Sequence, residues 1–387
     1  MTLKEKNKTF LGIINLAILI TLFLAGLWPI TFWPENGVEW LKDKNGICFH
    51  KLGIIYSPQP LKVSVQNPLH NGEITIDIWL QPETEPAHSI AHILTFFDGT
   101  TSENLILAQW KSWLIIRSMN TDVVKKNVYK EIGISNALPK GKLRFITITS
   151  GKGGTSIYLD GSLAKVYPNY RLSVENQKTL GNLILGNSST GKNSWKGNIK
   201  GLAIYSNFLK PSQVSHNYST WQDTGNPLLS EDDGIIALYL FNNENGNLVR
   251  DRSRQQNELI IPTTFTVLQK KILELPVADF KPSLSYFVDL AVNITGFIPF
   301  GIFFTLYLSK IKNSFNYRIY LFTVLMGMVI SLTIEILQAY IPTRSSSSID
   351  LITNTLGTTI GVVIFLLAMK IKQHHLHCCL HKSHNAI

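Results

Sequence analysis

Apolar residues gather into four long blocks along the chain, and the pattern between the blocks is different in kind. The blocks run from Phe10 to about Trp33, from about Tyr286 to Leu308, from about Tyr317 to Ile341, and from about Leu351 to Met369. A helix needs about 20 consecutive apolar residues to cross the core of a bilayer, so each block is long enough. The pattern therefore predicts a bundle of four transmembrane helices.

The region between the first two blocks, residues 35–280, shows short apolar runs, alternation and frequent turn residues. Residues 74–80 and 145–149 alternate between apolar and polar with a period of two. Gly151 to Gly154 lie between two such runs, as do Asp160 and Gly161. Strands at this spacing, with few helical stretches, predict an all-β sandwich. The expected fold is thus in two parts, a four-helix α bundle and a β domain.

The first apolar block has two interpretations. Lysines at positions 4, 6 and 8 precede it, and a cleaved signal peptide also begins basic and then turns apolar. Against that alternative, the block is about 24 residues long, has no clear small-x-small cleavage site, and ends with Trp28 and Trp33. Tryptophans are common where a helix leaves the membrane. We therefore expect a retained helix.

Charged residues at the ends of the blocks predict the orientation. The link at residues 309–316 holds two lysines and the C-terminal tail holds three, whereas Arg344 is the basic residue of the link at residues 342–348. By the positive-inside rule both termini are cytoplasmic and residues 35–280 are extracytoplasmic. The formal net charge of +10 is explained mainly by these flanks and by attraction to the membrane surface. No motif for reading bases stands out, so we expect no nucleic-acid partner.

These patterns divide the chain into four parts. They are residues 1–34 with the first helix, residues 35–280 with the β domain, residues 281–371 with three helices, and the cytoplasmic tail at residues 372–387. The tail is rich in potential metal ligands: His374, His375, His377, Cys378, Cys379 and His381. Their spacing matches no ordinary structural zinc pattern, so a solvated tail is expected. Cys48 is the remaining cysteine, and three cysteines make no disulfide framework.

Polar residues recur inside the membrane blocks at matched positions. The second block opens with Asp289-Leu-Ala-Val-Asn293-Ile-Thr-Gly296, and the fourth with Asp350-Leu-Ile-Thr-Asn354-Thr-Leu-Gly357. In each copy the Asp and Asn are four residues apart and share a helix face. The third helix runs the other way and carries Glu335 and Gln338 near its outer end. At a rise of 1.5 Å per residue, these groups converge roughly 6–10 Å inside the outer surface.

Such residues are costly in a membrane, at about 2.5–3.5 kcal/mol for each ionised group. One interpretation is that they join helices through hydrogen bonds, with the two aspartates as N-terminal caps. The other is a polar pocket open to the outer surface, and the two are compatible. The candidate pocket consists of Asp289, Asn293, Glu335, Gln338, Arg344, Asp350 and Asn354. Gly357 and Gly361 have the spacing for close helix packing, and Pro299 should bend the second helix.

The stretch from Asp289 to Lys370 resembles the VanZ-like family of membrane proteins. The matching features are Asn293-x-x-Gly296-Phe-Ile-Pro299-Phe-Gly301, Ser331-Leu-Thr-Ile-Glu335-Ile-Leu-Gln338, Pro342-x-Arg344 and Asp350-x-x-x-Asn354-x-x-Gly357-x-x-x-Gly361. The resemblance makes residues 10–34 the family's first helix, separated from the others by an insertion. It implies a role in the cell envelope and in resistance to glycopeptide antibiotics such as teicoplanin.

The β region resembles a laminin G-like domain, a jelly roll of the concanavalin A type. The matching stretches are Ile74 to Trp79, Ser156-Ile-Tyr-Leu-Asp160-Gly161, Leu183 to Gly186, Trp195-Lys-Gly197, Ile204-Tyr205, Ala237 to Phe241 and Asp251-Arg-Ser253. Domains of this kind bind glycans or proteins, some of them with calcium. Asp98, Asp122 and Asp160 suit turns, and no cluster of carboxylates compels a calcium site, so no metal is predicted.

Two functions follow from this combination. In the first, a non-enzymatic envelope protein binds an envelope polysaccharide or protein outside and a lipid-linked glycan in the pocket. In the alternative, a membrane enzyme acts on a lipid-linked glycan or phosphate. Asp289, Glu335 and Asp350 would then act as acid and base groups or as cation ligands, and Arg344 would hold a phosphate. The chain has no Walker loop, serine elbow or His-Glu-x-x-His run, so the sequence leaves enzymatic activity and any cofactor open.

Overall fold

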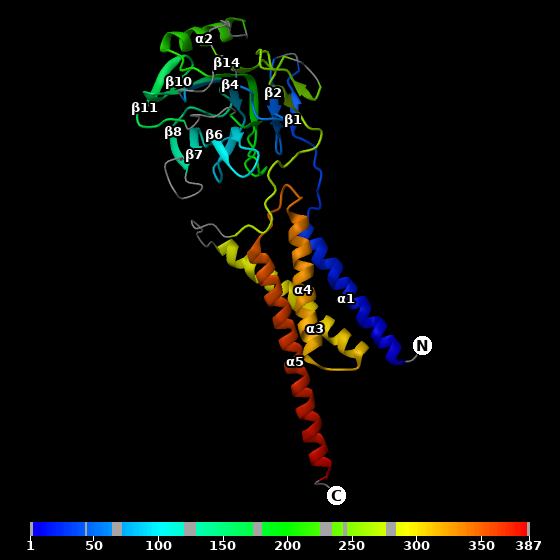
Figure 1. The fold of residues 1–387 in the computed structure, drawn as a ribbon. Coiled ribbons are helices and arrows are strands. Elements are labelled where there is room, and N and C mark those ends of the chain that lie inside the picture. The colour runs from blue at the N-terminus through cyan, green and yellow to red at the C-terminus, as the bar shows by residue number, and fades with distance from the viewer. Residues whose placement is uncertain are drawn as a thin grey trace. The chain divides into compact units, whose positions relative to one another are not determined.

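A computed structural model describes residues 3–42, 45–63, 72–119, 129–172, 180–224, 234–242, 246–275 and 284–384. The chain forms two compact units, which are described separately. The β unit is Trp33–Gln269, and the helical unit consists of Met1–Phe32 with Lys270–Ile387 (Figure 1). The domain boundary expected at residue 280 lies outside the described residues.

The β unit is a sandwich of two antiparallel sheets, each with eight strands in the described part of the chain. The first sheet has the order β1 (Val38–Trp40), β2 (Ile47–Phe49), β13 (Gly197–Tyr205), β4 (Ile74–Pro82), β9 (Arg144–Gly151), β10 (Gly154–Leu159) and β11 (Ser162–Tyr167), with β14 (Ile235–Tyr239) also paired to β13. The second has the order β15 (Leu248–Val249), β16 (Leu259–Ile260), β3 (Ile55–Tyr56), β12 (Asn182–Leu185), β5 (Ala91–Phe97), β6 (Glu103–Trp110), β7 (Trp113–Met119) and β8 (Tyr129–Ile134). The predicted all-β sandwich is confirmed.

Alternation along β4 explains how the sandwich builds its core. Ile74, Ile76, Ile78 and Leu80 are at most 2% exposed and pack in the main apolar cluster. Burying each such side chain contributes about 1.5–3 kcal/mol. The intervening residues point to the opposite face of the sheet, where a second layer covers them.

That second layer is the helix α2 (Pro211–Thr224), which the sequence analysis did not predict. Trp221 packs so closely over Gly201 of β13 that a Cβ atom there would overlap the indole ring. Beneath the helix, the buried carboxylate of Asp77 accepts hydrogen bonds from Thr147 Oγ1 (2.5 Å) and Asn217 Nδ2 (3.1 Å). Asp77 therefore links α2 to two neighbouring strands.

The predicted turn residues are found in turns. Asp160 and Gly161 join β10 to β11 with φ angles of 52° and 76°, and Asp160 also pairs with Arg144. Asp98 accepts hydrogen bonds from three successive backbone N–H groups, those of residues 100, 101 and 102. Asp122 lies outside the described residues.

The helical unit contains α1 (Leu3–Leu27), α3 (Leu284–Lys312), α4 (Tyr317–Gln338) and α5 (Ser348–His384). Within the described residues these four helices are long and apolar enough to cross a membrane. The first helix ends at Leu27, before Pro29, so the expected span to Trp33 was too long. Proline lacks the N–H group of the helical hydrogen bond and disfavours helix at the residue before it, which accounts for the end of α1 before Pro29. At the other end of the chain, α5 continues beyond Met369 through the predicted tail to His384.

α1 is an integral part of this bundle. Leu27 is buried with Phe300 and Ile334 in one apolar cluster. Asn15, in the middle of α1, donates from Nδ2 to the backbone carbonyl of Phe303 in α3 (3.2 Å). This packing favours a retained helix over a cleaved signal peptide.

α3 and α5 approach each other through glycines, as the spacing of Gly357 and Gly361 predicts. A Cβ atom added at Gly361 would lie 2.9 Å from Gly301 Cα, and one added at Gly357 would overlap the Ile294 carbonyl oxygen. Gly296 holds the equivalent place in the other Asp-Leu-x-x-Asn-x-x-Gly copy. A Cβ atom there would meet no heavy atom within 4 Å among the described residues.

The two glycines should therefore respond differently to the same substitution. Gly357→Ala places a methyl group against the α3 backbone, which cannot move aside, and should destabilise the bundle by about 1–3 kcal/mol. Gly296→Ala has room and should be neutral or stabilising by up to about 1 kcal/mol, since alanine favours helix. Thermal unfolding of the purified full chain in one detergent measures both. Equal effects of the two variants would contradict the close packing of α3 on α5.

Asp77 should make the stability of the β unit depend on pH. Burial raises the pKa of Asp77 to about 6, although its hydrogen bonds oppose the shift, whereas an unfolded aspartate has a pKa of about 3.9. At pH values between these two pKa values, the folded state therefore binds more protons than the unfolded state does. Its free energy of unfolding should fall as the pH rises from about 4 to about 6, by about 3 kcal/mol in all.

Asp77→Asn removes this titration, so the stability of the wild type relative to the variant should fall across that pH window. Thermal unfolding followed by near-UV circular dichroism at several pH values provides the measurement. Asp223→Asn, at an exposed position in α2, is the matched control and should keep the wild-type profile. A difference between wild type and Asp77→Asn that does not vary with pH would contradict the assignment.

Candidate functional site

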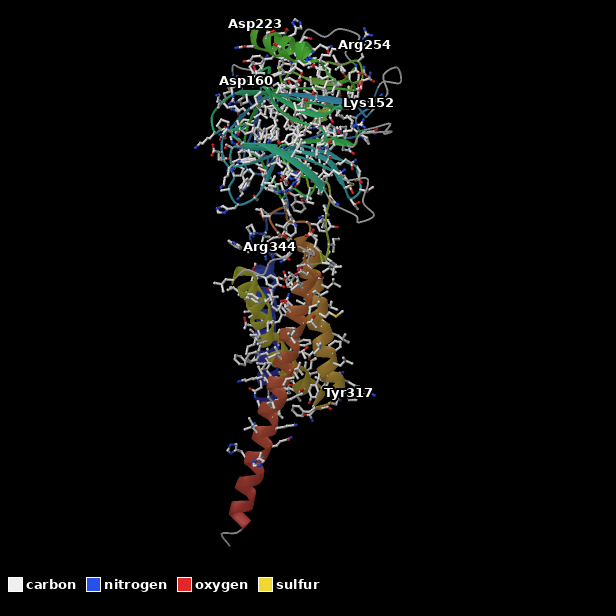
Figure 2. The ribbon with its side chains drawn as sticks, turned by 90° about the vertical axis from the view of Figure 1, so that its left-hand side faces the viewer. Lys152, Asp160, Asp223, Arg254, Tyr317 and Arg344 are labelled. Atoms are coloured by element: carbon white, nitrogen blue, oxygen red, sulfur yellow. The ribbon has the colours of Figure 1, made fainter. Side chains whose placement is uncertain are left out.

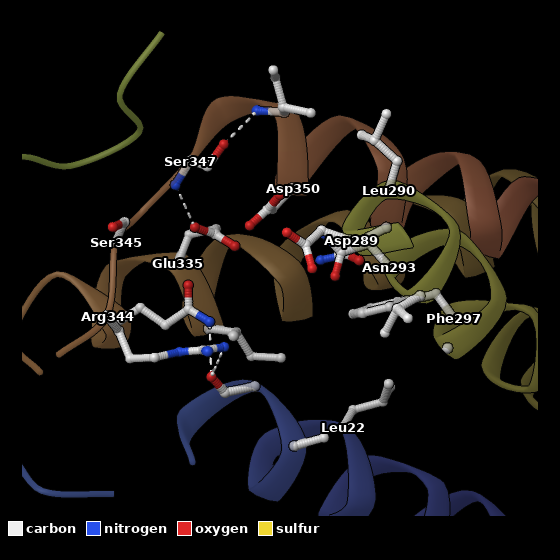
Figure 3. A pocket seen from close by; sticks show the side chains of 18 of the residues that line it. Leu22, Asp289, Leu290, Asn293, Phe297, Glu335, Arg344, Ser345, Ser347 and Asp350 are labelled. Atoms are coloured by element: carbon white, nitrogen blue, oxygen red, sulfur yellow. Dashed lines mark hydrogen bonds between the residues drawn. The ribbon is translucent and has the colours of Figure 1, made fainter. Parts of the chain in front are cut away.

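A pocket of about 650 Å³ opens at one end of the helix bundle. It is lined by residues of α1, α3, α4 and α5 and of the link between α4 and α5. All seven candidate residues line it: Asp289, Asn293, Glu335, Gln338, Arg344, Asp350 and Asn354 (Figure 3). Tyr317, where α4 begins, and Arg344, just past its end, mark opposite ends of the bundle in Figure 2.

The direction of each helix explains this convergence. α3 and α5 each bring an Asp-Asn pair in their N-terminal parts, and the four-residue spacing puts both members on one face. α4 ends where those helices begin, and its last turn carries Glu335 and Gln338. The polar residues of three spans therefore reach one level, as their spacing along each helix predicts.

Three carboxylates form the centre of the pocket. Figure 3 shows Asp289, Glu335 and Asp350 pointing toward one another. Glu335 is 1% exposed, and its Oε2 accepts a hydrogen bond from the backbone N–H of Ser347 (2.7 Å). Like charges this close repel, and low polarity strengthens the repulsion. The centre of the pocket is therefore suited to a cation or to hydrogen-bond donors.

Arg344 and Gln338 meet at the end of α1, which the sequence analysis did not foresee. Arg344 Nη2 and Gln338 Nε2 both donate to the backbone carbonyl of Gly26, at 3.0 Å and 2.8 Å. Gly26 lies in the last turn of α1, whose carbonyls have no partner within the helix and carry partial negative charge. Pro29 is the sequence signal that could have located this acceptor, because helices usually end before a proline.

Two side-chain oxygens at the pocket lack partners. Asn354 Nδ2 donates to Ser331 Oγ at 2.9 Å, which is the helix-joining role considered above. Asn354 Oδ1 and Gln338 Oε1, however, are buried with no hydrogen-bond partner among the described residues. Leaving such an atom unpaired costs about 1–3 kcal/mol. This deficit favours a site that receives a ligand or water over packing alone.

The aspartates do not cap their helices, in contrast to one of the interpretations above. Asp289 lies well inside α3, which begins at Leu284. At the start of α5, Ser347 precedes the first helical residue and its Oγ accepts from the Ile349 N–H at 3.2 Å. Asp350 is therefore free of the capping role and faces the pocket.

Apolar side chains complete the lining. Leu22 of α1, Phe297 of α3 and Ile334 of α4 lie on the pocket wall beside the polar groups. The pocket thus offers one polar side and one apolar side, a combination suited to an amphipathic ligand.

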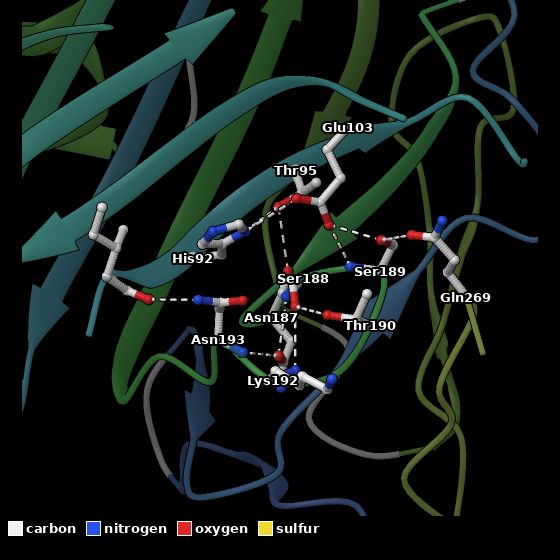
Figure 4. A network of polar contacts seen from close by, with 11 residues as sticks. His92, Thr95, Glu103, Asn187, Ser188, Ser189, Thr190, Lys192, Asn193 and Gln269 are labelled. Atoms are coloured by element: carbon white, nitrogen blue, oxygen red, sulfur yellow. Dashed lines mark hydrogen bonds and ion pairs between the residues drawn. The ribbon is translucent and has the colours of Figure 1, made fainter. Parts of the chain in front are cut away.

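The β unit has a separate polar cluster between β5, β6 and the loop after β12 (Figure 4). Glu103 Oε1 accepts from the backbone N–H and the Oγ of Ser189, at 2.7 Å and 2.8 Å. His92 Nδ1 lies 3.7 Å from Glu103 Oε2. Burial, with the nearby Arg117, lowers the pKa of His92 to about 3, so the ring is neutral near pH 7 and forms no ion pair. Ser189 Oγ also bonds Gln269 (3.0 Å), and the cluster holds the end of the β unit in place.

Two parts of the chain match protein families. Residues 234–369 match the family described as VanZ/LLP1, and residues 59–215 match the concanavalin A-like lectin/glucanases superfamily. The first match begins before the helices and includes β14, β15 and β16. No curated protein matches the chain.

Several solved structures are similar to the chain at low identity. One is a Bacteroides ovatus protein to which carbohydrate binding has been ascribed, which is 12% identical with a TM-score of 0.38. The match covers 60% of this chain and 62% of that protein, which is less than two thirds of its length. The binding domain of botulinum neurotoxin serotype D is 14% identical, with a TM-score of 0.36, over 49% of each chain. A heptameric SAP-like pentraxin from Limulus polyphemus is 14% identical, with a TM-score of 0.29, over 48% of this chain and 80% of its own.

The VanZ match covers residues of α3, α4 and α5 and the link between α4 and α5. These elements carry all seven predicted pocket residues. The superfamily match covers the strands from β4 to β13. The chain therefore combines a VanZ-like membrane region with a concanavalin A-like domain of the laminin G type.

Proposed function

We propose that this protein is a non-enzymatic component of the cell envelope. The β unit binds an envelope glycan or protein outside the membrane, and the helical unit holds a lipid-linked partner. The observation that carries the proposal is the pocket, whose seven polar residues come from different spans and face a common space with apolar walls.

The lining suits the head group and first acyl segment of a lipid-linked glycan. Sugar hydroxyls and ammonium groups donate hydrogen bonds, and the carboxylates of Asp289, Glu335 and Asp350 accept them. Arg344 keeps donors beyond the one bonded to Gly26, and a guanidinium is a strong partner for phosphate. Leu22 and Phe297 would contact the hydrocarbon part.

The orientation is part of the proposal. Lys310 and Lys312 lie in the last turn of α3, and Arg318 lies in the first turn of α4. That end of the bundle is opposite to the pocket. By the positive-inside rule it faces the cytoplasm, so the pocket opens in the outer leaflet and the β unit is extracytoplasmic.

Residues 59–215 match a superfamily that includes lectins, and this match supports a glycan partner. Trp110 and Trp113 form a cross-strand pair at the β6–β7 turn and are 37% and 39% exposed. Exposed aromatic rings offer rigid, partly apolar faces of the kind found in binding sites. We assign the glycan contact to this turn. We also propose that the protein contributes to resistance to glycopeptide antibiotics, as the VanZ match suggests.

The three converging carboxylates favour a second candidate function, an enzyme acting on a lipid-linked glycan or phosphate. Glu335, buried and held by one backbone N–H, would serve as an acid or base, with Asp289 and Asp350 binding a cation. Proton transfer by a placed carboxyl group contributes about 10²–10⁴-fold to a rate. The first function is preferred because these groups alone specify no reaction.

Filling the pocket should abolish the function of the helical unit. Gly296→Leu extends into space that is free around a Cβ atom at this position, so the fold should persist while a ligand is excluded. When this variant is expressed in a strain whose chromosomal gene is deleted, the strain should stay as sensitive to teicoplanin as the deletion strain without it. Val329→Leu is the matched control, since Val329 is 51% exposed on the outside of α4. It should restore wild-type resistance at equal membrane abundance.

Glu335→Gln in the same strain separates the two functions. If the pocket only binds, the amide keeps most contacts and resistance should fall in part. If the carboxyl transfers a proton, the variant should behave like the deletion. A Gly296→Leu variant that restores full resistance would contradict both, because neither function tolerates a filled pocket.

Glycan binding should depend on the β6–β7 turn. The full chain in nanodiscs should pull down purified envelope polysaccharide, and the double variant Trp110→Ala, Trp113→Ala should lose at least about 10-fold in affinity, equal to about 1.4 kcal/mol. Leu163→Ala, at an exposed apolar position of β11, serves as the control. Absence of binding to every envelope polysaccharide tested, with the β unit folded by circular dichroism, would reject the glycan partner.

A further inference from the structure

Three potential metal ligands gather on the outer face of the first sheet of the β unit, and a fourth lies beside one of them. Cys48 Sγ lies 3.6 Å from His50 Nε2 and 3.5 Å from Glu83 Oε1. One ligand atom from each of Cys48, His50 and Glu83 lies within 4.8 Å of the others. Glu39 Oε2 lies 3.7 Å from His50 Nε2. These residues come from β1, from β2 and the position after it, and from the position after β4.

Two of these distances match the edges of a tetrahedral zinc site. With Zn–S about 2.3 Å and Zn–N and Zn–O about 2.0–2.1 Å, tetrahedral angles put S and N about 3.6 Å apart and S and O about 3.5 Å apart. The distances from Cys48 Sγ to His50 and Glu83 agree with both values. The Glu39–His50 distance is somewhat longer than the N–O edge of about 3.3 Å expected from the same bond lengths.

We propose that Cys48, His50 and Glu83 bind a zinc ion, with the carboxylate of Glu39 as the fourth ligand. A thiolate, an imidazole and carboxylates together are a donor set that zinc accepts, whereas calcium and magnesium require oxygen ligands throughout. On binding, the Zn–S bond replaces the S–H bond of Cys48, and the thiol proton leaves to solvent.

Strand register explains why the ligands face one space. Ile47 and Phe49 point into the core and are fully buried, so Cys48 between them points to the other face. Across the sheet, Cys48 pairs with Glu39 of β1 on one side and with Asn198 of β13 on the other. The ion would thus join β2 to the end of β4 across β13, which lies between them.

Asn198 supplies a second, independent observation. It stands in the same cross-strand row as Cys48, and its side-chain Oδ1 is buried with no hydrogen-bond partner in the described part of the chain. Buried polar atoms are satisfied in nearly all native structures, so an unpaired one points to a missing water or ion nearby. An imidazole turned by the ion would supply that partner.

The test must separate this site from the C-terminal tail, which also carries cysteines and histidines. The parent protein is therefore the full chain with Cys378 and Cys379 changed to Ser and the five tail histidines changed to Asn. The chain has three cysteines, so Cys48 becomes its sole thiol. Any thiolate-to-metal charge-transfer absorption on adding Co²⁺, an optical substitute for Zn²⁺, then comes from Cys48.

We expect the parent in detergent to show this absorption with one Co²⁺ per chain, and Zn²⁺ to displace the Co²⁺. Zn²⁺ should also raise the unfolding temperature of the β unit. His50→Gln and Glu83→Gln should each weaken Zn²⁺ binding by about 100-fold or more. His88→Gln, at an exposed position between β4 and β5, is the matched control and should bind as the parent does.

If the folded parent shows no charge-transfer absorption, the proposal is overturned, and no variant of the site is needed to reach that conclusion. Zn²⁺ affinity that His50→Gln and Glu83→Gln leave unchanged would also overturn it. Glu39→Gln tests the fourth position: a loss of affinity supports Glu39 as a ligand, and an unchanged affinity rejects Glu39 as the fourth ligand.

Discussion

The close contact between α3 and α5 is the constraint on which the rest of the membrane region depends. Lipid tails are as apolar as leucine, so burial of apolar surface does not drive helices together in a bilayer; close packing and hydrogen bonds do. Gly301, Gly357 and Gly361 leave no room for a side chain between the two backbones. Because α3 and α5 run in the same direction, this contact brings their two Asp-Asn pairs to one place. The two copies of the motif nevertheless differ in use, since Gly357 packs against α3 whereas Gly296 faces the pocket.

Once the two helices are joined, α4 brings its own polar groups, Glu335 and Gln338, to the same place. Glu335 is almost fully buried, and a buried carboxylate requires donors, a cation or a shared proton. The structure supplies the Ser347 N–H to it directly. Arg344 donates a hydrogen bond to the Gly26 carbonyl in the last turn of α1. The pocket therefore retains more acceptors than donors, which is the physical basis for assigning it a ligand with hydroxyl or ammonium groups.

The β unit obtains its stability in a different way. Its alternating strands bury apolar side chains between the two sheets, and polar residues on the outer faces are joined in small clusters. Asp77 ties α2 to the first sheet, the His92 and Glu103 cluster holds the loop after β12, and Cys48 links β2 to the end of β4 through Glu83. With one cysteine in this unit, no disulfide contributes, and a bound ion at Cys48 would take over that role for β1, β2 and β4.

Features that arise within single helices and strands could be predicted from the sequence. Apolar block length identified the four spans and alternation identified the sandwich. The positions of polar residues along three helices and one link placed seven of them at one level, because these signals are local to an element or its end. Tertiary structure alone decided which groups meet across large separations in the chain. Examples are the Gly26 carbonyl with Arg344, Ser331 with Asn354, and Cys48 with Glu83. Such contacts depend on strand register, helix rotation and the point where a helix ends, and these are fixed only when the whole unit packs together.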